Sequence, residues 1–435
     1  MPSSPPLRWA DLAGARVGLW GLGTEGAASR RLLATMGVAP ICVEDRPESP
    51  DVLAIGAGGL EALSGCEVVV KSPGVSRYRP EVEALEAAGV AVVGGLGLWL
   101  EGADRDRVIC VTGTKGKSTT VSILGHLLTG LGRPAFTGGN LGYAPFDPDA
   151  PDDIDTWVIE VSSYQATDLW SAPPVVGVTS LHADHVDWHG SAARYYADKL
   201  SLCTKPGAQH VVANGTDPLL RAHERMLGPA PRWVVPTHGA DEWWVAALGL
   251  RGEHNHTNAV IAGACLIAYG VVASPDALAA AAAGFDGLPS RLRSILTVDG
   301  VEFVDDSLST NVLPTIAALS VFPDRRVALL VGGFDRRIDY GPLAACLATR
   351  ATPLLVVALP DNGARIEEAI AGCSPMVEVV RAAGLDDAVP RAWRWARPDG
   401  VVLLSPAAPS FGRFTDYRAR AAAFAAAAAR CETTA

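Results

Sequence analysis

The sequence has no apolar run long enough to cross a bilayer. Its apolar stretches, such as 90–93 and 327–331, are far shorter than the roughly 20 residues that a spanning helix requires. The first letters, MPSSPPLRWADL, contain no apolar core of a signal peptide. We therefore expect a soluble, cytoplasmic protein that has no membrane partner.

Positive charge is also scarce. The 435 residues include 36 lysines and arginines against 47 aspartates and glutamates, which gives a formal charge of −11. No summed basic field is available to hold nucleic acid nonspecifically, so nucleic acid is not an expected partner. An anionic ligand must be bound by local groups.

Closely spaced cysteines are absent as well. Eight cysteines are spread along the chain and no two form a CxxC unit, which favours reduced, mostly buried thiols over a zinc site or a disulfide framework. A composition with 49% hydrophobic and 19% charged residues excludes a mainly disordered chain.

Short β-branched runs alternate with longer Ala/Leu-rich stretches throughout the chain. This alternation predicts an α/β fold of mainly parallel sheets covered by helices. Strands are expected at 16–20, 39–44, 67–71, 108–112, 156–160, 175–179, 209–213, 301–304, 326–331, 353–358 and 401–404. These are more strands than one sheet of usual size holds, and the length allows two or three domains.

Two seams divide the chain, a charged Gly-containing segment at 101–106 and a polar stretch at 290–300. We therefore predict three domains, at 1–104, 105–296 and 297–435. Two alanine-rich segments, 277–283 and 419–429, are predicted to be ordinary helices because alanine is the best helix former.

The sharpest motif is a strand that runs into a Gly-rich turn and then a helix. Strand 108–112 is followed by Gly113-Thr-Lys-Gly-Lys-Ser-Thr-Thr120. In such a loop the backbone N–H groups bind phosphate, Lys117 reaches the terminal phosphates and Ser118 offers a hydroxyl to Mg²⁺. Val111 stands at the first glycine of the general GxxxxGK[ST] form, so the loop is shorter. The alternative, a Gly-rich turn with an exposed lysine, does not explain the order of strand, loop and helix.

Glu160 ends the predicted strand 156–160. A carboxylate at that point would face the phosphates and bind Mg²⁺. The alternative is a structural glutamate, which when buried must be paired.

Three histidines and two aspartates follow in a short segment, namely His182, Asp184, His185, Asp187 and His189. Their density predicts a group of metal ligands, although any one of these histidines could be a surface hydrogen bonder. No recognised zinc spacing is present, and the phosphate chemistry nearby favours Mg²⁺.

The first predicted strand leads into Gly21-Leu-Gly23-Thr-Glu-Gly26, and Glu44 and Asp45 end the next strand. This spacing is typical of a diphosphate site with a carboxylate for a ribose hydroxyl. A UDP-linked substrate fits it as well as NAD does.

Together these motifs resemble the Mur ligase family, and in particular its glutamate-adding members. The resemblance covers essentially the whole chain. The matching stretches are the loop at 113–120, Gly138-Gly-Asn140-Leu-Gly142, Glu160-Val-Ser-Ser-Tyr-Gln165, Asp184-His185-Val-Asp187, Lys199, Gly252-Glu-His-Asn255 with Asn258, Arg291, Asp305-Asp306-Ser307 with Thr310-Asn311, Gly332-Gly333, and 404–411.

The resemblance implies an N-terminal Rossmann-like domain for a UDP-sugar, a central P-loop ATPase with a mainly parallel sheet, and a C-terminal Rossmann-like domain that closes over an amino acid. It implies ATP and two Mg²⁺ ions as cofactors. The implied substrates are UDP-N-acetylmuramoyl-L-alanine and glutamate, and the implied protein is a monomer.

The resemblance also assigns residues, each by its match to a family motif. The implied catalytic residues are Lys117, Glu160, His185 and Lys199. ATP would be bound by Gly113, Thr114, Lys115, Gly116, Lys117, Ser118, Thr119, Asn255, Arg291 and Asp306. The UDP-sugar would be bound by Gly21, Leu22, Gly23, Thr24, Asp45, Arg46, Ser72, Gly74 and Asn140. The amino acid would be bound by Thr310, Arg336, Ser410, Phe411 and Tyr417.

The implied metal ligands are Ser118, Glu160, His185 and Lys199, the last as a carbamylated lysine. Lys205 lies close behind and is the alternative for the modified lysine. The implied reaction has the substrate carboxylate attack the γ-phosphate of ATP, and the amine of glutamate then attack the resulting acyl phosphate. Domain closure would exclude water.

Several positions depart from the family pattern. Leu308 and Arg336 stand where lysines are expected, and Lys115 stands where asparagine is common. Arginine is a planar fork rather than a point charge, so Arg336 would re-aim a bound carboxylate. Ser410, Phe411 and Tyr417 keep the general pattern without every side chain. These changes favour the addition of L-glutamate over D-glutamate.

Other interpretations are open at this stage. An L-alanine-adding Mur ligase shares the N-terminal loop, whereas a diaminopimelate- or lysine-adding one would carry an Asp-Asn-Pro-Arg type motif that we do not find. Folylpolyglutamate synthase would lack the N-terminal loop, an NAD-dependent dehydrogenase would explain only the first hundred residues, and a regulatory P-loop NTPase would lack ligase activity.

Overall fold

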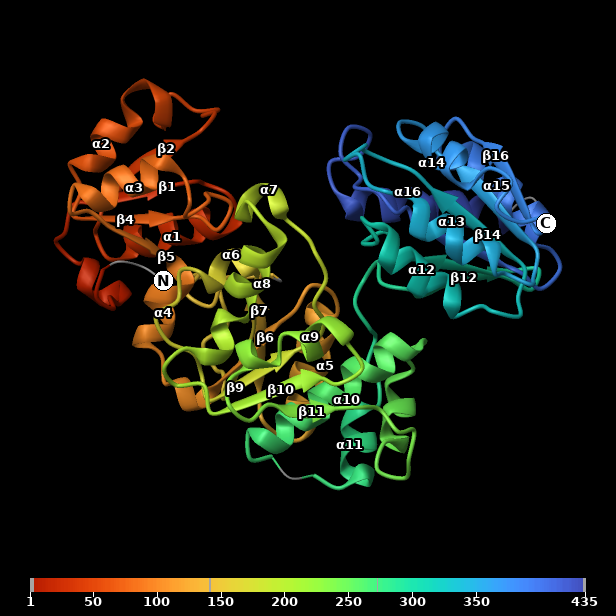
Figure 1. Cartoon of the computed structure of the whole chain (residues 1–435), viewed down its shortest axis with the longest axis horizontal. Coiled ribbons are helices and arrows are strands. Elements are labelled where there is room, and N and C mark those ends of the chain that lie inside the picture. Colours follow the sequence, from red (N-terminus) through yellow and green to blue (C-terminus); the bar gives the residue numbers. More distant parts are fainter. Residues whose placement is uncertain (1–3, 141, 272, 433–435) are drawn as a thin grey trace. The chain divides into compact units, whose positions relative to one another are not determined.

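The computed structural model describes residues 4–140, 142–271 and 273–432, and their strands form three sheets along the chain (Figure 1). The chain divides into two compact units. The first runs to Gly249 and includes Asn255–Phe285, and the second comprises Leu250–His254 and the chain from Asp286 onward. Each unit is described by itself.

The N-terminal sheet has the order β3-β2-β1-β4-β5, with all neighbours parallel. Its strands are β1 Val17–Trp20, β2 Ile41–Glu44, β3 Leu53–Ala54, β4 Val68–Lys71 and β5 Ala91–Gly94. Its helices are α1 Thr24–Thr35, α2 Leu60–Ser64, α3 Pro80–Ala87 and α4 Gly95–Gly102. This strand order is that of a dinucleotide-binding fold without its sixth strand, which agrees with the Rossmann-like fold that the resemblance implies.

The central sheet, also parallel throughout, has the order β11-β10-β9-β6-β8-β7. Its strands are β6 Val108–Thr112, β7 Ala135–Gly139, β8 Thr156–Glu160, β9 Val175–Val178, β10 His210–Asn214 and β11 Arg232–Val234. The helices in this part of the chain are α5 Lys117–Gly130, α6 Ser163–Ala166, α7 Val186–His189, α8 Ala192–Leu200, α9 Pro218–Ala222, α10 Glu253–Ala268 and α11 Pro275–Ala282.

The C-terminal sheet has the order β12-β13-β17-β14-β15-β16, and only the β12–β13 pair in it is antiparallel. Its strands are β12 Arg293–Val298, β13 Val301–Asp305, β14 Val327–Val331, β15 Leu354–Ala358, β16 Val377–Arg381 and β17 Val401–Leu404. Its helices are α12 Val312–Ser320, α13 Gly341–Ala348, α14 Gly363–Ile370, α15 Leu385–Ala396 and α16 Tyr417–Glu432.

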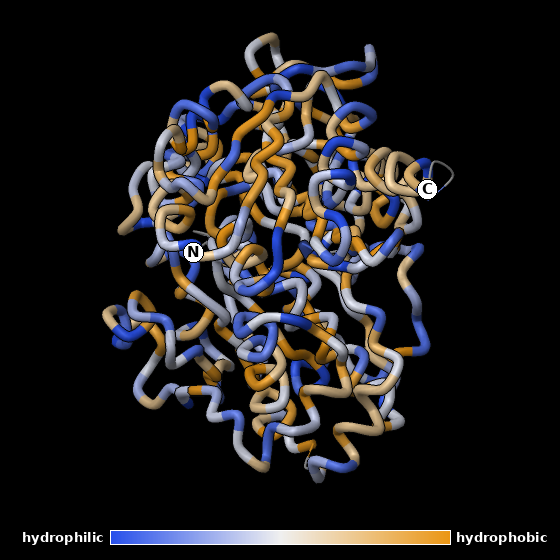
Figure 2. Tube along the Cα trace, turned by 90° about the vertical axis from the view of Figure 1, so that its right-hand side faces the viewer, coloured by the Kyte–Doolittle hydropathy of each residue, from blue (hydrophilic) through white to orange (hydrophobic). Residues whose placement is uncertain are grey.

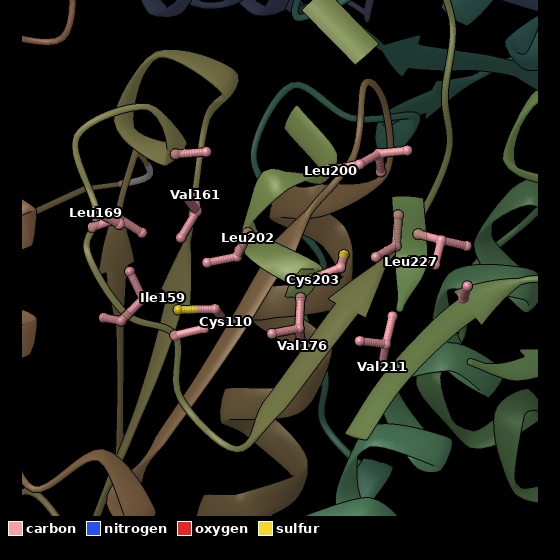
Figure 3. Close-up of a cluster of buried hydrophobic side chains, with 14 of the residues drawn as sticks. Cys110, Ile159, Val161, Leu169, Val176, Leu200, Leu202, Cys203, Val211 and Leu227 are labelled. Carbon is pink, nitrogen blue, oxygen red and sulfur yellow. The ribbon is translucent and has the colours of Figure 1, made fainter. Parts of the chain in front are cut away.

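The inner strands of all three sheets are apolar on both faces, because helices cover both sides of a parallel sheet. Figure 2 shows hydrophobic segments gathered in the interior and most hydrophilic segments toward the outside. In the central sheet Cys110, Ile159 and Val176 belong to one buried cluster with Leu200 and Leu202 from the segment around the end of α8 (Figure 3). This core supports the loops that leave the strands at their carboxyl ends.

All eleven predicted strands are present, with small shifts at their ends, and the two alanine-rich helices are α11 and α16. The six strands that the sequence did not predict are β3, β5, β7, β11, β12 and β16, which are the two edges of each sheet. Edge strands are often short or polar, so they lack the apolar run on which the prediction rested.

Most of the second compact unit runs from Asp286 onward, and β12 belongs to its sheet, whereas the predicted domain boundary at residue 297 stays a prediction. The two earlier sheets share one compact unit, and the division between them at residue 104 stays a prediction. The eight cysteines are free, and six of them are buried. Within the described ranges, no helix is long and apolar enough to cross a membrane.

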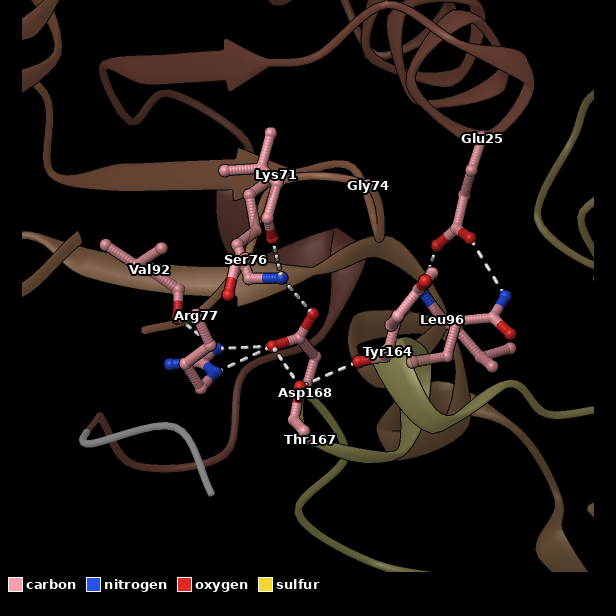
Figure 4. Close-up of polar contacts among 12 residues, drawn as sticks. Glu25, Lys71, Gly74, Ser76, Arg77, Val92, Leu96, Tyr164, Thr167 and Asp168 are labelled. Atoms are coloured by element: carbon pink, nitrogen blue, oxygen red, sulfur yellow. Dashed lines mark hydrogen bonds and ion pairs between the residues drawn. The ribbon is translucent and has the colours of Figure 1, made fainter. Parts of the chain in front are cut away.

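A buried group of charges joins the N-terminal and central sheets (Figure 4). Asp168, which is 2% exposed, accepts from Lys71 Nζ at 2.6 Å and from Arg77 Nε at 2.7 Å. Lys71 also donates to the Val75 carbonyl oxygen and Arg77 to that of Val92. Burial alone would raise the pKa of Asp168, but the two cations outweigh it and lower this pKa. The loop that follows β4 is thereby fixed against the segment that follows β8.

Replacing Asp168 with asparagine would remove the ion-pair partner of the buried Lys71 and leave Arg77 paired with Glu86 alone. We expect Asp168→Asn to lower the free energy of unfolding of the first unit by about 3–5 kcal/mol. The measurement is urea unfolding followed by hydrogen exchange of the β4 and β8 amides. The control is Asp11→Asn, which breaks the exposed pair with Arg8 and should lower the free energy of unfolding far less. Equal losses in the two variants would contradict the proposed role of the buried group.

Candidate functional site

The Gly-rich loop between β6 and α5 closes tightly around the neighbouring strand end. Gly113 has φ +140° and Gly116 has φ +92°, both unfavourable for residues with a side chain. A Cβ at Gly113 would lie 2.1 Å from Thr179 Oγ1, and one at Gly116 would lie 2.4 Å from Asn258 Oδ1. Helix α5 begins at Lys117, so its N-terminal end lies at this loop, as the phosphate-binding motif predicts.

The loop is held by the segment that follows β9. The Thr114 amide donates to the Ser180 carbonyl oxygen at 2.8 Å, and the Lys115 amide donates to Ser180 Oγ at 2.9 Å. Thr114 Oγ1 lies 2.9 Å from the Tyr195 hydroxyl. These bonds fix the loop's shape before any ligand arrives, which lowers the cost of binding.

Glu160, Lys117 and Asn140 gather at the carboxyl end of β8. Asn140 Nδ2 donates to Glu160 Oε1 at 2.9 Å, and Lys117 Nζ lies 3.8 Å from the same oxygen. The side chain is 2% exposed, and Glu160 Oε2 has no hydrogen-bond partner within the described residues. A buried carboxylate oxygen with no donor suits a divalent cation, and Mg²⁺ takes few protein ligands because phosphate oxygens and waters complete its shell.

Lys199 extends from α8 to the same loop. It is 2% exposed, and its Nζ donates to the Gly113 carbonyl oxygen at 2.9 Å. Burial, together with the charge of Lys117, holds the pKa of Lys199 well below its usual value, so the amine is favoured as neutral. Lys205, the alternative, donates instead to the Leu169 carbonyl oxygen at 2.6 Å. Of these two lysines, therefore, Lys199 is the one in contact with the phosphate-binding loop.

The predicted group of histidines and aspartates does not form a metal centre. In the part of the chain that the structure describes, no three His, Cys, Asp or Glu side chains lie close enough to hold an ion together. His182 lies 4.0 Å from Asp217 and His185 lies 3.9 Å from Asp184. The predicted shared ligand group is therefore not formed in the described residues, where His189 is bonded instead to Asp198 and Ser163.

His189 has a structural role that its sequence position did not show. Its Nδ1 lies 2.6 Å from Asp198 Oδ2 and its Nε2 lies 3.0 Å from Ser163 Oγ, and the ring is almost fully buried. The Tyr78 hydroxyl donates to the other oxygen of Asp198 at 2.7 Å. These hydrogen-bonded side chains join α6, α7 and α8. They thereby place His185, one helical turn before His189, near Tyr164, with the ring centroids 5.0 Å apart.

Asp184 and His185 lie beside the phosphate-binding loop, where Asp184 pairs with Lys115. Burial lowers the pKa of His185, which favours the neutral ring that can accept a metal or a proton. Lys115 Nζ lies 3.3 Å from Asp184 Oδ2. Asn258, which packs on Gly116, has its Nδ2 3.5 Å from Asn255 Oδ1, so Asn255 lies close to this loop, and its contact with ATP stays a prediction.

The N-terminal loop after β1 has the close packing of a diphosphate site. Gly21 has φ +89°, and Ser72 Oγ donates to its carbonyl oxygen at 2.6 Å. A Cβ at Gly26 would lie 1.9 Å from that same oxygen, so glycine is required there. Helix α1 begins at Thr24, and its N-cap is Gly23. Four predicted residues of the UDP-sugar site, Gly21, Leu22, Gly23 and Thr24, thus lie together with Ser72 at one helix end.

The acidic residues after β2 have partners in the structure. Glu44 Oε1 accepts from the Leu22 amide, and both oxygens of Asp45 accept from Arg79 at 2.7 and 2.8 Å. Arg46 is exposed, and the Gly74 carbonyl oxygen accepts from Trp188 Nε1 at 3.2 Å. The charge of Asp45 is therefore balanced by Arg79. The sequence analysis did not predict Arg79 as a neighbour of Asp45.

In the second unit Asp306 and Ser405 meet where β13 and β17 end. Ser405 Oγ donates to Asp306 Oδ2 at 2.7 Å, and the Leu292 amide donates to Oδ1 at 3.1 Å. Burial raises the pKa of Asp306 to about 6. Arg291 belongs to the same unit, and its charge acts on this carboxyl group. The predicted contacts of these two residues with ATP stay a prediction.

Of the residues predicted to bind the amino acid, Arg336 and Phe411 lie near each other, with the Arg336 guanidinium 6.0 Å from the Phe411 ring centroid. Ser410 is buried, whereas Phe411 is half exposed. Arg420 was not predicted and is 1% exposed. It donates to the Ala408 and Ser307 carbonyl oxygens at 3.0 and 2.7 Å and so ties the loops that carry Ser410 and Thr310 to α16.

Comparison with known proteins agrees with this geometry. Residues 111–242 match the Mur ligase middle domain, and residues 290–408 match the Mur ligase glutamate ligase domain. A protein of a Micromonospora species named UDP-N-acetylmuramoyl-L-alanine–L-glutamate ligase is 41% identical, over 96% of this chain and 97% of its own. A protein of the same name from Xanthomonas euvesicatoria is 39% identical, over 96% of each chain.

Solved structures share the fold. A UDP-N-acetylmuramate-alanine ligase, MurC, from Thermotoga maritima aligns with a TM-score of 0.60 at 17% identity, over 97% of this chain and all of that one. A MurF ligase of the same organism, crystallised with ADP, aligns with a TM-score of 0.56 at 15% identity, over 96% and 94% of the two chains. At such identities the likeness concerns the fold alone. The sequence relatives and domain matches go further, and they confirm that the chain belongs to the Mur ligase family.

Proposed function

We propose that this Mur ligase, an ATP-dependent ligase of peptidoglycan precursor synthesis, joins L-glutamate to UDP-N-acetylmuramoyl-L-alanine and releases ADP and phosphate. The observation that carries the proposal is the near full-length likeness to relatives named for that reaction, at 38–41% identity. The phosphate-binding loop with Lys117, Glu160 and Lys199 around it is the geometry such a reaction needs.

The chemistry begins with two anions that repel each other. The terminal carboxylate of the UDP-sugar substrate attacks the γ-phosphate of ATP, and the bond to ADP breaks, which gives an acyl phosphate. Lys117 and the backbone N–H groups at the start of α5 are placed to offset the negative charge that collects there. The amine of glutamate then attacks the acyl carbon, loses a proton and expels phosphate.

Glu160 and Ser118 would hold Mg²⁺, because both are buried beside the loop and Glu160 Oε2 has no other partner among the described residues. The ion would supply positive charge to the phosphate oxygens. His185 and Lys199 would serve a second ion. A neutral amine can add carbon dioxide to become a carbamate, and the burial of Lys199 without an ion-pair partner in the described ranges favours that neutral form.

The N-terminal loop at Gly21 and the Ser72 segment would bind the diphosphate of the UDP-sugar. Asn140 would orient the sugar's acid arm, since its amide already contacts Glu160 at 2.9 Å. We further propose that the enzyme acts as a monomer in the cytoplasm, with small molecules as its only partners.

Lys117→Ala removes the ammonium that faces the phosphates. We expect amide formation to fall by about 100- to 1000-fold in kcat/KM for ATP, because a single preorganised charge of this kind contributes that much. ADP release coupled to product formation is the measurement. Lys117→Arg, which keeps the charge, should retain more activity. Near-normal turnover in Lys117→Ala would remove this loop from the mechanism.

Lys199→Ala should lower kcat by about 100-fold or more, and short carboxylates added to the buffer should restore part of the activity. Lys205→Ala is the matched control, because Lys205 is also buried and also donates to a carbonyl oxygen but does not touch the loop. It should keep its activity and show no response to carboxylates. Full activity of Lys199→Ala without them would contradict the carbamate.

The stereoisomer is tested by offering D- and L-glutamate separately with UDP-N-acetylmuramoyl-L-alanine, ATP and Mg²⁺. We expect amide product and stoichiometric ADP with L-glutamate, because the relatives named above carry that isomer in their names. Product with D-glutamate alone would identify the D-glutamate-adding enzyme instead, and AMP in place of ADP would overturn the acyl-phosphate route.

A further inference from the structure

A cavity of about 180 Å³ opens at the carboxyl ends of β14, β15 and β16 in the second unit. Its polar side chains are Asp361, Ser410, Arg413 and Arg420, and its apolar wall includes Leu359 and Phe414. A single water needs about 10–15 Å³ on this measure, so the space can admit a ligand group. Ligands of open α/β sheets bind at this end of the strands.

The cavity wall is preorganised by backbone bonds. The Gly333 amide donates to Asn362 Oδ1 at 2.9 Å, and the Phe334 amide donates to the Pro409 carbonyl oxygen at 2.9 Å. A Cβ at Gly333 would lie 2.3 Å from that Pro409 oxygen, so only glycine allows these two backbone segments to lie so close together. Asp361 has φ +77°, a strained conformation that the surrounding structure maintains at this cavity.

Arg413 lines the cavity, and only part of its guanidinium group is hydrogen-bonded. Only its Nε contacts Asp361, at 3.4 and 3.3 Å from the two oxygens, and its terminal nitrogens have no hydrogen-bond partner in the described residues. The side chain is half exposed, with 51% of its surface accessible. A planar fork with two open N–H edges matches a carboxylate.

The lining carries more positive than negative charge. Arg420 is 1% exposed, and its Nε has no hydrogen-bond partner among the described residues, although its other two nitrogens are bonded. The cavity is therefore lined by two arginines, Arg413 and Arg420, and by one aspartate, Asp361. An anionic group fits such a cavity, and the Ser410 hydroxyl adds a further polar contact for it.

We propose that Arg413 binds the side-chain carboxylate of the incoming amino acid in this cavity and thereby selects a dicarboxylic amino acid over a neutral one. The inference rests on the proposed function and names the residue that sets its amino-acid specificity. The amine must stay outside the cavity, because it has to reach the acyl phosphate. The far carboxylate is the part of glutamate that can enter.

The test compares glutamate with glutamine, which has the same shape but no side-chain charge, in the full-length enzyme with UDP-N-acetylmuramoyl-L-alanine, ATP and Mg²⁺. In Arg413→Gln we expect the KM for glutamate to rise about 10- to 100-fold and the preference for glutamate over glutamine to fall by the same factor. The KM values for ATP and the UDP-sugar should change less than about twofold, because Arg413 touches neither.

Arg391→Gln is the matched control. Arg391 is also 51% exposed and also donates through Nε to an aspartate, Asp387, but it does not line the cavity. It should behave as the wild type. Arg413→Lys keeps the charge and loses the fork, so its preference should lie between those of the wild type and Arg413→Gln, and it replaces Arg413→Gln if that variant does not fold.

The outcomes separate the two proposals. A folded Arg413 variant with an unchanged preference for glutamate over glutamine overturns the role of Arg413 and leaves the proposed function standing. A wild-type enzyme that forms no amide with glutamate, or that joins a neutral amino acid equally well, overturns the proposed function and this inference with it.

Discussion

The predicted functional residues of this enzyme depend on one constraint. Parallel strands bring their carboxyl ends to the same edge of a sheet. β6, β8 and β9 lie side by side, so the phosphate-binding loop, Glu160 and Thr179 emerge next to one another from distant parts of the sequence. The same holds for the loops after β1 and β4, where Ser72 bonds to Gly21. Helices cover both faces of such a sheet, and those that follow its strands turn their N-terminal ends toward the same edge, so backbone N–H groups and side chains converge there.

Burial then decides what each charged side chain can do. Asp168 is buried with two cations and holds two segments together, because its charge is fully compensated. Lys199 is equally buried but bonds only to a backbone oxygen, and Glu160 keeps one oxygen without a donor among the described residues. Uncompensated groups of that kind are unfavourable for the fold by itself. Their place beside a phosphate-binding loop is consistent with stability given up for chemistry, whereas the Asp168 group shows what a purely structural arrangement of charges looks like.

The sequence predicted the inner strands and the phosphate-binding loop, since both are encoded locally: continuous apolar runs for the strands, and glycines at fixed spacing before Lys117 for the loop. It missed the edge strands of every sheet, whose short or polar sequences carry no such signal. It also grouped His182, His185 and His189 by their closeness in sequence, although His189 is buried and bonded to Ser163 and Asp198. Partners separated by many residues, such as Arg79 for Asp45, cannot be read from spacing.

In the cavity that we propose for the amino acid, arginines supply positive charge where lysines of the family are missing. Leu308 and Arg336 stand where the family has lysines, yet the second unit supplies guanidinium groups at Arg413 and Arg420 around one cavity. A lysine offers a point charge that tolerates many carboxylate orientations, whereas an arginine fork favours one plane. A site that uses arginines therefore discriminates by geometry as well as by charge. Two stereoisomers of glutamate carry the same charges, so charge alone cannot separate them.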